Sequence, residues 1–105
     1  MGENWYHGSN RRFSLLRKGS TVTPWRELAE AFSHKPTLLS IDDARQIRHN
    51  GRKSGYLYRI DEPVEWGVDV YPHPNSSMEA GLEYLTGRPL RVRLLAVTGA
   101  PEEMW

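Results

Sequence analysis

The first stretch that could carry chemistry is segment 5–9, whose sequence WYHGS places two aromatic rings, an imidazole, a glycine and a hydroxyl side by side. Aromatic residues favour a short strand. Gly8 allows a turn, or the approach of a peptide group to a ligand without an intervening Cβ. We therefore expect a site at which a ligand meets both His7 and exposed backbone. The alternative for His7 is a buried ring whose hydrogen bonds are satisfied by its neighbours.

Other kinds of catalytic centre find little support in the sequence. The remaining histidines, His34, His49 and His73, are far apart along the chain and form no close ligand pair, so we expect no metal site. The absence of cysteine excludes disulfides, a thiolate nucleophile and cysteine-ligated metal. Motifs typical of serine hydrolases and P-loop proteins are also absent.

Length and charge limit the possible partners. A chain of 105 residues predicts a single domain, 1–105, in which residues 98–105 form a tail. The 14 Lys and Arg nearly balance the 13 Asp and Glu, without the positive excess of many nucleic-acid-binding domains. The first residues lack an apolar signal core, and no run approaches the roughly 20 apolar residues of a spanning helix. We expect a cytoplasmic protein with no membrane partner.

One helix is predicted directly after residue 23. Thr23 suits the N-cap and Pro24 the first helical position, where a missing N–H costs nothing. An apolar stripe with helical spacing follows, formed by Trp25, Leu28, Ala29 and Phe32. Pro36 disfavours helical geometry in the residue before it, so the helix should end within residues 33–35.

Segment 40–53 is predicted to form a second helix followed by a basic loop. Ser40 could cap this helix, with Asp43 reaching back to it as in a capping box. Ile41, Ala44 and Ile47 or Arg48 would continue the helix. The basic part contains Arg45, Arg48, His49, Arg52 and Lys53. These residues could grip a phosphate, but a mobile, solvated loop is the interpretation we favour.

Several short strands are expected around these helices. Residues 5–9, 20–23, 56–60 and 90–97 have the β-branched, aromatic or alternating character of strands. Val68 and Val70 suggest another strand, whereas prolines make 71–77 a flexible loop that could close over a site. The predicted fold class is α+β, with a mixed or split, antiparallel-rich sheet and one or two helices.

Four pieces of the chain, in this order and spacing, resemble the ADP-ribosyltransferase superfamily. They are residues 6–9 (YHGS), residues 21–24 (TVTP), the Ala-rich helix that ends in Phe32, and residues 83–92 (EYLTGRPLRV). The phrase RPLRV is most similar to the small bacterial rifampin ADP-ribosyltransferases. The resemblance spans roughly residues 5 to 95. It implies an ADP-ribosyltransferase-like fold with NAD as co-substrate.

The resemblance also implies a key carboxylate. Transfer of ADP-ribose breaks the bond between nicotinamide and ribose, and positive charge develops on the ribose. In the resembled family, a glutamate just before the late strand stabilises this charge. Glu83 holds that position here, Glu79 and Asp69 are close rivals, and an ordinary surface carboxylate is the alternative for Glu83.

The cofactor-binding residues implied by the resemblance are His7, Gly8, Ser9, Thr21, Thr23 and Phe32. His7 would also serve catalysis by donating a hydrogen bond to a ribose hydroxyl. The Gly8 backbone would meet the nicotinamide carboxamide, and Ser9 would support the turn. Thr21 stands where the family usually has a tyrosine stacked on nicotinamide, which predicts weakened or abolished NAD binding.

The function expected from the sequence is an NAD-dependent ADP-ribosyltransferase that acts on a small molecule, a protein side chain or a nucleic acid end. A first alternative is a catalytically silent member of the fold that binds a nucleotide or a macromolecular partner, which Thr21 and the basic segment favour. A second is an enzyme similar to RNA 2′-phosphotransferases. Glu83 distinguishes these functions, because only NAD cleavage requires that carboxylate.

Overall fold

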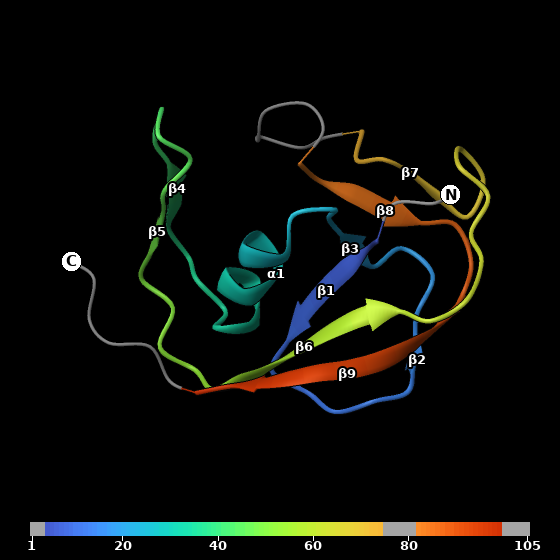
Figure 1. Cartoon of the computed structure of the whole chain (residues 1–105), viewed down its shortest axis with the longest axis horizontal. Coiled ribbons are helices and arrows are strands. Elements are labelled where there is room, and N and C mark those ends of the chain that lie inside the picture. Colours follow the sequence, from blue (N-terminus) through green and yellow to red (C-terminus); the bar gives the residue numbers. More distant parts are fainter. Residues whose placement is uncertain (1–3, 75–81, 100–105) are drawn as a thin grey trace.

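The computed structural model describes residues 4–74 and 82–99 and has an α+β architecture, as predicted. Helix α1 (Arg26–Ser33) lies between a sheet region on one side and a short hairpin on the other (Figure 1). Within the described ranges, no helix has the length and apolar character needed to cross a membrane. The strands are β1 (Tyr6–Ser9), β2 (Leu15–Leu16), β3 (Thr21–Val22), β4 (Leu39–Ile41), β5 (Ile47–His49), β6 (Gly55–Ile60), β7 (Val70–Pro72), β8 (Tyr84–Thr86) and β9 (Leu90–Thr98).

The largest sheet has the strand order β1-β6-β9-β2, with neighbouring strands antiparallel. Its two long strands, β6 and β9, pair from Gly55↔Thr98 to Ile60↔Val92, with an irregularity between Leu57 and Tyr58. These strands confirm the predictions from the alternating patterns at 56–60 and 90–97. Thr98, which we assigned to the tail, is the last residue of β9.

A second antiparallel sheet has the order β3-β8-β7. It joins the first sheet where Tyr6 and Thr23 exchange backbone hydrogen bonds of 2.8 and 3.0 Å. The prediction of a loop over 71–77 is wrong at its start, because Tyr71 and Pro72 belong to β7. Pro72 is tolerated there because β7 is an edge strand. Residues 75–77 lie outside the described part of the chain.

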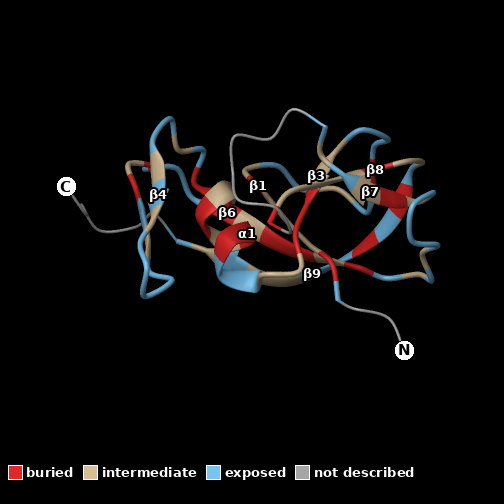
Figure 2. Ribbon diagram, turned by 90° about the horizontal axis from the view of Figure 1, so that it is seen from above, coloured by how far each residue is buried: buried red, intermediate tan, exposed pale blue. Residues whose placement is uncertain are grey.

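The main apolar core forms between these two sheets. It comprises Trp5, Leu16, Val22, Tyr58, Ile60, Val70, Leu90 and Val92. Strand β6 is buried on both faces, since adjacent Leu57 and Tyr58 are each at most 1% exposed. Leu28 and Ala29 are buried where α1 packs against β1 and β6 (Figure 2). Each fully buried aliphatic side chain contributes roughly 1.5–3 kcal/mol relative to an exposed one.

The helix begins later than predicted. Thr23 is not its N-cap, because its backbone is still paired with Tyr6 in an extended bridge. The Thr23 hydroxyl instead accepts a hydrogen bond of 3.2 Å from the N–H of Trp25. Trp25 is the N-cap, with extended geometry and no side-chain capping bond. The helix ends at Ser33, within the predicted range.

The predicted second helix is wrong: β4 and β5 form an antiparallel hairpin with the register Leu39↔His49 and Ile41↔Ile47. Two contacts of Asp42 close its turn. Its carboxylate accepts a 2.8 Å hydrogen bond from the N–H of Gln46, and its carbonyl accepts one of 2.9 Å from Arg45. Arg45 has a left-handed backbone with φ of 63°, which interrupts a right-handed helix.

Candidate functional site

A cavity of about 320 Å³ gathers several of the predicted site residues. Its walls come from β1, β3, the end of α1, the segment that connects α1 to β4, and the residue before β8. The lining residues are His7, Gly8, Thr21, Phe32, Lys35, Pro36, Thr37, Leu39 and Glu83. Five of the seven residues proposed for catalysis or cofactor binding therefore line one cavity, although they come from distant parts of the sequence.

His7 is held in one tautomer by its neighbour across the cavity wall. Its Nδ1 lies 2.6 Å from the carbonyl oxygen of Thr21. Because a carbonyl only accepts, Nδ1 carries the proton and Nε2 of the neutral ring is a lone-pair acceptor. The resemblance implies a donor at this ring, so the structure reverses the expected direction of a bond between Nε2 and a ribose hydroxyl.

The electrostatic surroundings favour the neutral ring. Burial lowers the pKa of His7 below its ordinary value, the hydrogen bond to Thr21 opposes that shift, and the charge of Lys35 adds to it. Since the pKa lies below about 6.5, His7 is mostly neutral at pH 7. The ring also lies near the side chain of Phe13, with ring centroids 5.8 Å apart. These contacts fix an acceptor on the cavity wall at neutral pH.

Gly8 is required by packing as well as by its place in the cavity. A Cβ at this position would lie 1.8 Å from the carbonyl oxygen of Ala29 and 2.7 Å from the nitrogen of Ser33. Both are backbone atoms of α1 and have little freedom to move. Gly8 therefore allows β1 to approach the helix closely, in addition to presenting backbone to the cavity.

Ser9 and Thr23 do not line the cavity. Ser9 is buried, and its hydroxyl accepts a hydrogen bond of 3.1 Å from the N–H of Arg11. This contact supports the turn after β1, the role that the resemblance implies for it. Thr23 is fully buried, with its hydroxyl bonded to the N–H of Trp25. Both side chains position the chain around the cavity.

Thr21 and Phe32 do line the cavity. Thr21 contributes its carbonyl to His7 and pairs with Leu85 in the second sheet. Phe32 is half-buried near the end of α1. Another aromatic ring could cover nicotinamide in place of a residue at 21, but Tyr56, Tyr58 and Tyr71 are not among the described residues that line the cavity. Tyr58 is bonded through its hydroxyl to the carbonyl of Arg11 at 2.7 Å.

Among the described residues, Glu83 is the acidic residue that lines the cavity. It directly precedes β8, and its carbonyl accepts a 3.1 Å hydrogen bond from the N–H of His73. Its rival Asp69 is absent from the lining, and its carboxylate is bound by Arg88 at 2.9 Å and by the N–H of Glu65 at 2.8 Å. These bonds hold the pKa of Asp69 below its usual range. The other rival, Glu79, lies outside the described residues.

The RPLRV phrase forms part of a structural network. Arg88 joins Asp69 to Glu62, with a distance of 2.9 Å to each carboxylate. Glu62 also accepts a 2.6 Å hydrogen bond from the N–H of Arg91. The Arg91 and Arg88 contacts hold the pKa of Glu62 low. Arg88 therefore ties the segment after β6 to the start of β9.

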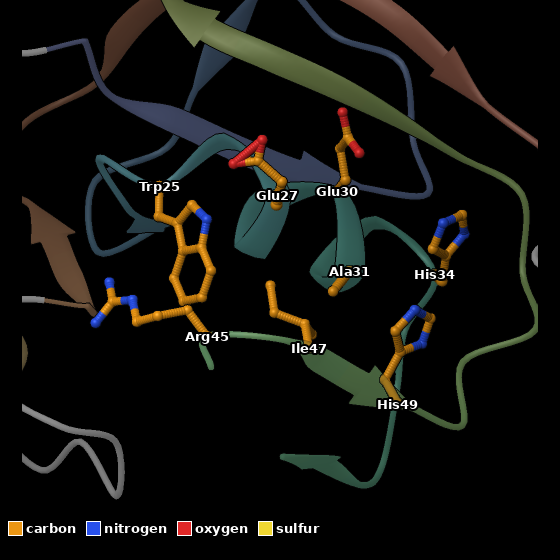
Figure 3. Close-up of a pocket in the computed structure, with 8 residues that line it drawn as sticks. All are labelled: Trp25, Glu27, Glu30, Ala31, His34, Arg45, Ile47 and His49. Carbon is orange, nitrogen blue, oxygen red and sulfur yellow. The ribbon is translucent and has the colours of Figure 1, made fainter. Parts of the chain in front are cut away.

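A larger cavity of about 560 Å³ lies between α1 and the hairpin (Figure 3). At one end Arg45 lies over the ring of Trp25, at 4.6 Å from its centroid. At the other end His34 and His49 stack with ring centroids 5.4 Å apart. The full lining is Trp25, Glu27, Glu30, Ala31, His34, Arg45, Ile47 and His49. We take the smaller cavity as the functional site because it collects the predicted residues.

His34 and His49 are distant in the sequence, but the fold brings their rings together. The signal was the alternation of Leu39, Ile41, Ile47 and His49 around a turn, which indicates a hairpin that returns His49 to the end of α1. The basic residues of this segment differ in their exposure to solvent. His49 is buried, whereas Arg48, Arg52 and Lys53 are exposed. Over residues 4–74 and 82–99, no group of three or more histidine or acidic side chains is arranged to hold a metal ion.

Comparison with known protein families, characterised proteins and solved structures found no match for this chain. A functional proposal therefore depends on the residues and geometry of the cavity.

Proposed function

We propose that the chain is an NAD-dependent ADP-ribosyltransferase that uses the 320 Å³ cavity to bind the nicotinamide riboside half of NAD. The observation that carries the proposal is that His7 and Glu83, from opposite ends of the chain, line the same cavity. The volume lies near the lower end of typical ligand pockets, about 300–1,000 Å³. This size suits part of a dinucleotide, with the remainder extending outside.

The roles of the residues follow from their chemistry. Glu83 supplies the negative charge that stabilises the oxocarbenium-like transition state. Neutral His7 accepts a hydrogen bond from a ribose hydroxyl through Nε2 and so orients the sugar. Phe32 provides an apolar wall, and Lys35 places a positive charge at the rim where the diphosphate would leave the cavity.

The reaction is a substitution at ribose C1′. The bond from C1′ to the nicotinamide nitrogen breaks, and its electron pair leaves with nicotinamide. A nucleophilic atom of the acceptor bonds to C1′ and releases its proton to water. The acceptor is a small molecule, a protein side chain or a nucleic acid end.

Thr21 favours one alternative function. A small side chain in place of the usual stacking tyrosine leaves one face of nicotinamide less covered, which fits a protein that binds a nucleotide without cleaving NAD. Nicotinamide release separates the two functions, because a silent binder releases none.

The direct test is incubation with NAD labelled in the nicotinamide ring, followed by measurement of released nicotinamide. Glu83→Gln keeps the size and hydrogen bonding of the side chain but removes its charge. We expect release to fall by about 10²- to 10³-fold, the loss typical for one preorganised group. Glu65→Gln, an exposed change before β7, is the matched control and should leave release unchanged. Equal release by wild type and Glu83→Gln would contradict the role of Glu83.

A further inference from the structure

The stacked histidines connect the end of α1 to the end of β5. His34 is the C-cap of α1, and His49 is the last residue of β5. Both are buried, at 8% and 6% exposure, and their ring planes lie within 8° of parallel. Figure 3 shows the two rings facing each other at one end of the larger cavity.

The hydrogen bonds assign a different tautomer to each ring. Nδ1 of His34 lies 2.7 Å from the carbonyl oxygen of Lys53, so this nitrogen carries a proton. Nδ1 of His49 accepts a buried 3.1 Å hydrogen bond from the N–H of Gly51, so in the neutral ring the proton is on Nε2. A proton added to Nδ1 of His49 would remove the only acceptor that this bond uses.

The chain after β5 is packed tightly against His34. A Cβ at Gly51 would lie 2.6 Å from the carbonyl oxygen of His34 and 2.8 Å from its Cβ. The N–H of Lys53 donates to the same carbonyl at 3.3 Å. Separation of the two rings would therefore also loosen the backbone of residues 51–53.

The two histidines adjoin the two ends of one segment that forms a wall of the smaller cavity. The wall consists of Lys35, Pro36, Thr37 and Leu39. It begins directly after His34, and it ends at Leu39, the register partner of His49. Asn50, next to His49, accepts hydrogen bonds of 2.9 Å from the N–H groups of Thr37 and Leu38. His49 is thus linked to the start, middle and end of the wall.

Charged groups of both signs lie around the pair. Burial lowers the pKa of His49 most, and the nearby His34 and Arg52 lower it further. Lys35 and Lys53 flank the pair in the chain, and Arg45 lines the same cavity. Two carboxylates of α1, those of Glu27 and Glu30, line the same cavity as the pair, but in Figure 3 they point away from the two rings. Glu30 is also paired with Arg26 at 3.5 Å.

We propose that the His34–His49 pair positions residues 35–39 as a wall of the smaller cavity, and that protonation of His49 releases this wall. The ligand side of the inference rests on the proposed NAD site. Burial lowers the pKa of His49 in the folded protein, so the contact is complete above the ordinary histidine pKa of about 6.5 and is lost as the pH falls further, through the lowered pKa. Ligand affinity therefore falls on acidification through a residue outside the ligand cavity.

The first measurement needs no ligand. NMR follows the His49 ring, the Gly51 amide and the amides of Thr37 and Leu39 from pH 8 to pH 5. We expect the four signals to shift with one midpoint, and the protection of the Gly51 amide from exchange to fall at least about tenfold after correction for intrinsic rates. Titration of His49 with the Thr37 and Leu39 amides unmoved would overturn the proposal.

The second measurement uses NAD binding by calorimetry at pH 8 and pH 5.5. His49→Asn places a non-titrating oxygen near the position of Nδ1, and its pH dependence reports the titrating groups other than His49, including His7. Wild type should lose about fivefold more affinity than this variant, whereas Arg48→Gln, an exposed change on the same strand, should match wild type. If His49→Asn does not fold, His34→Asn, which retains a donor toward Lys53, replaces it.

The two measurements distinguish an incorrect role for the histidine pair from an incorrect proposed function. Identical pH profiles for wild type and His49→Asn would overturn the positioning role while NAD binding remained. Absence of NAD binding at every pH would contradict the proposed function, and the amide shifts of Thr37 and Leu39 would still decide whether His49 controls the wall.

Discussion

Helix α1 has two sides that are held in different ways. On one side it packs against β1 and β6 of the large sheet, where Leu57 is fully buried. On the other side lies the β4–β5 hairpin, whose inner residues Leu39, Ile41 and Ile47 are only half-buried. Polar contacts of Asp42 and Asn50, and the stacked histidines, hold that side together. The two cavities described above both have the hairpin as one boundary.

The largest expected effect is a loss of stability that differs between substitutions on the two sides of α1. Leu57→Ala removes a fully buried side chain from β6, on the sheet side of α1, and should lower the free energy of unfolding by about 2–5 kcal/mol. Ile41→Ala on the hairpin should lower it by about 1 kcal/mol or less, because the side chain is half-exposed. Urea unfolding measures both values. Equal losses would show that the hairpin belongs to the same packed core as the sheet.

A substitution on the sheet side of the smaller cavity should have an intermediate effect, in this case on NAD affinity. If Thr21 lies against nicotinamide, Thr21→Tyr adds an aromatic contact worth roughly 0.5–1.5 kcal/mol beyond simple burial. NAD should then bind several-fold to about tenfold more tightly. Calorimetry with NAD tests this, and ADP-ribose, which lacks nicotinamide, should show little change. Equal NAD affinity in a folded variant would place nicotinamide away from Thr21.

The smallest expected effect is at the tip of the hairpin. Arg45→Gln removes the guanidinium that lies 4.6 Å from the Trp25 ring centroid, a contact worth roughly 0.5–1 kcal/mol. The free energy of unfolding should fall by about that amount. Arg48→Gln, on the exposed face of β5, should change it by less than about 0.5 kcal/mol. A larger loss for Arg48→Gln would mean that the outer face of the hairpin also contributes.

The sequence predicted best the elements whose register is set by buried side chains. Alternation in β6 and β9 is strong because their inward residues fill the core, and the stripe at Leu28 and Ala29 faces the sheet. Pro36 located the end of α1 for a local steric reason. His7 and Glu83 were chosen from the family resemblance, and the fold brings both to one cavity.

The errors occur where particular polar or backbone contacts, some local and some between distant residues, decide the structure. The pattern SIDD at 40–43 resembles a helix start, but the Asp42 carboxylate binds Gln46 and closes a hairpin turn. Thr23 resembles an N-cap until its pairing with Tyr6 is known. The stacking of His34 on His49 depends on that hairpin and could not be predicted without it.

The central claim, that one cavity binds NAD between His7 and Glu83, is tested most directly by an NMR titration of the intact protein. With NAD raised to roughly millimolar concentration, a range that detects weak binding, the amide signals near His7 and near Glu83 should shift together and give one dissociation constant. The amides of β2, which lies at the far edge of the large sheet, should stay in place. Absence of a shift at both His7 and Glu83, or two different dissociation constants, would contradict a shared NAD site.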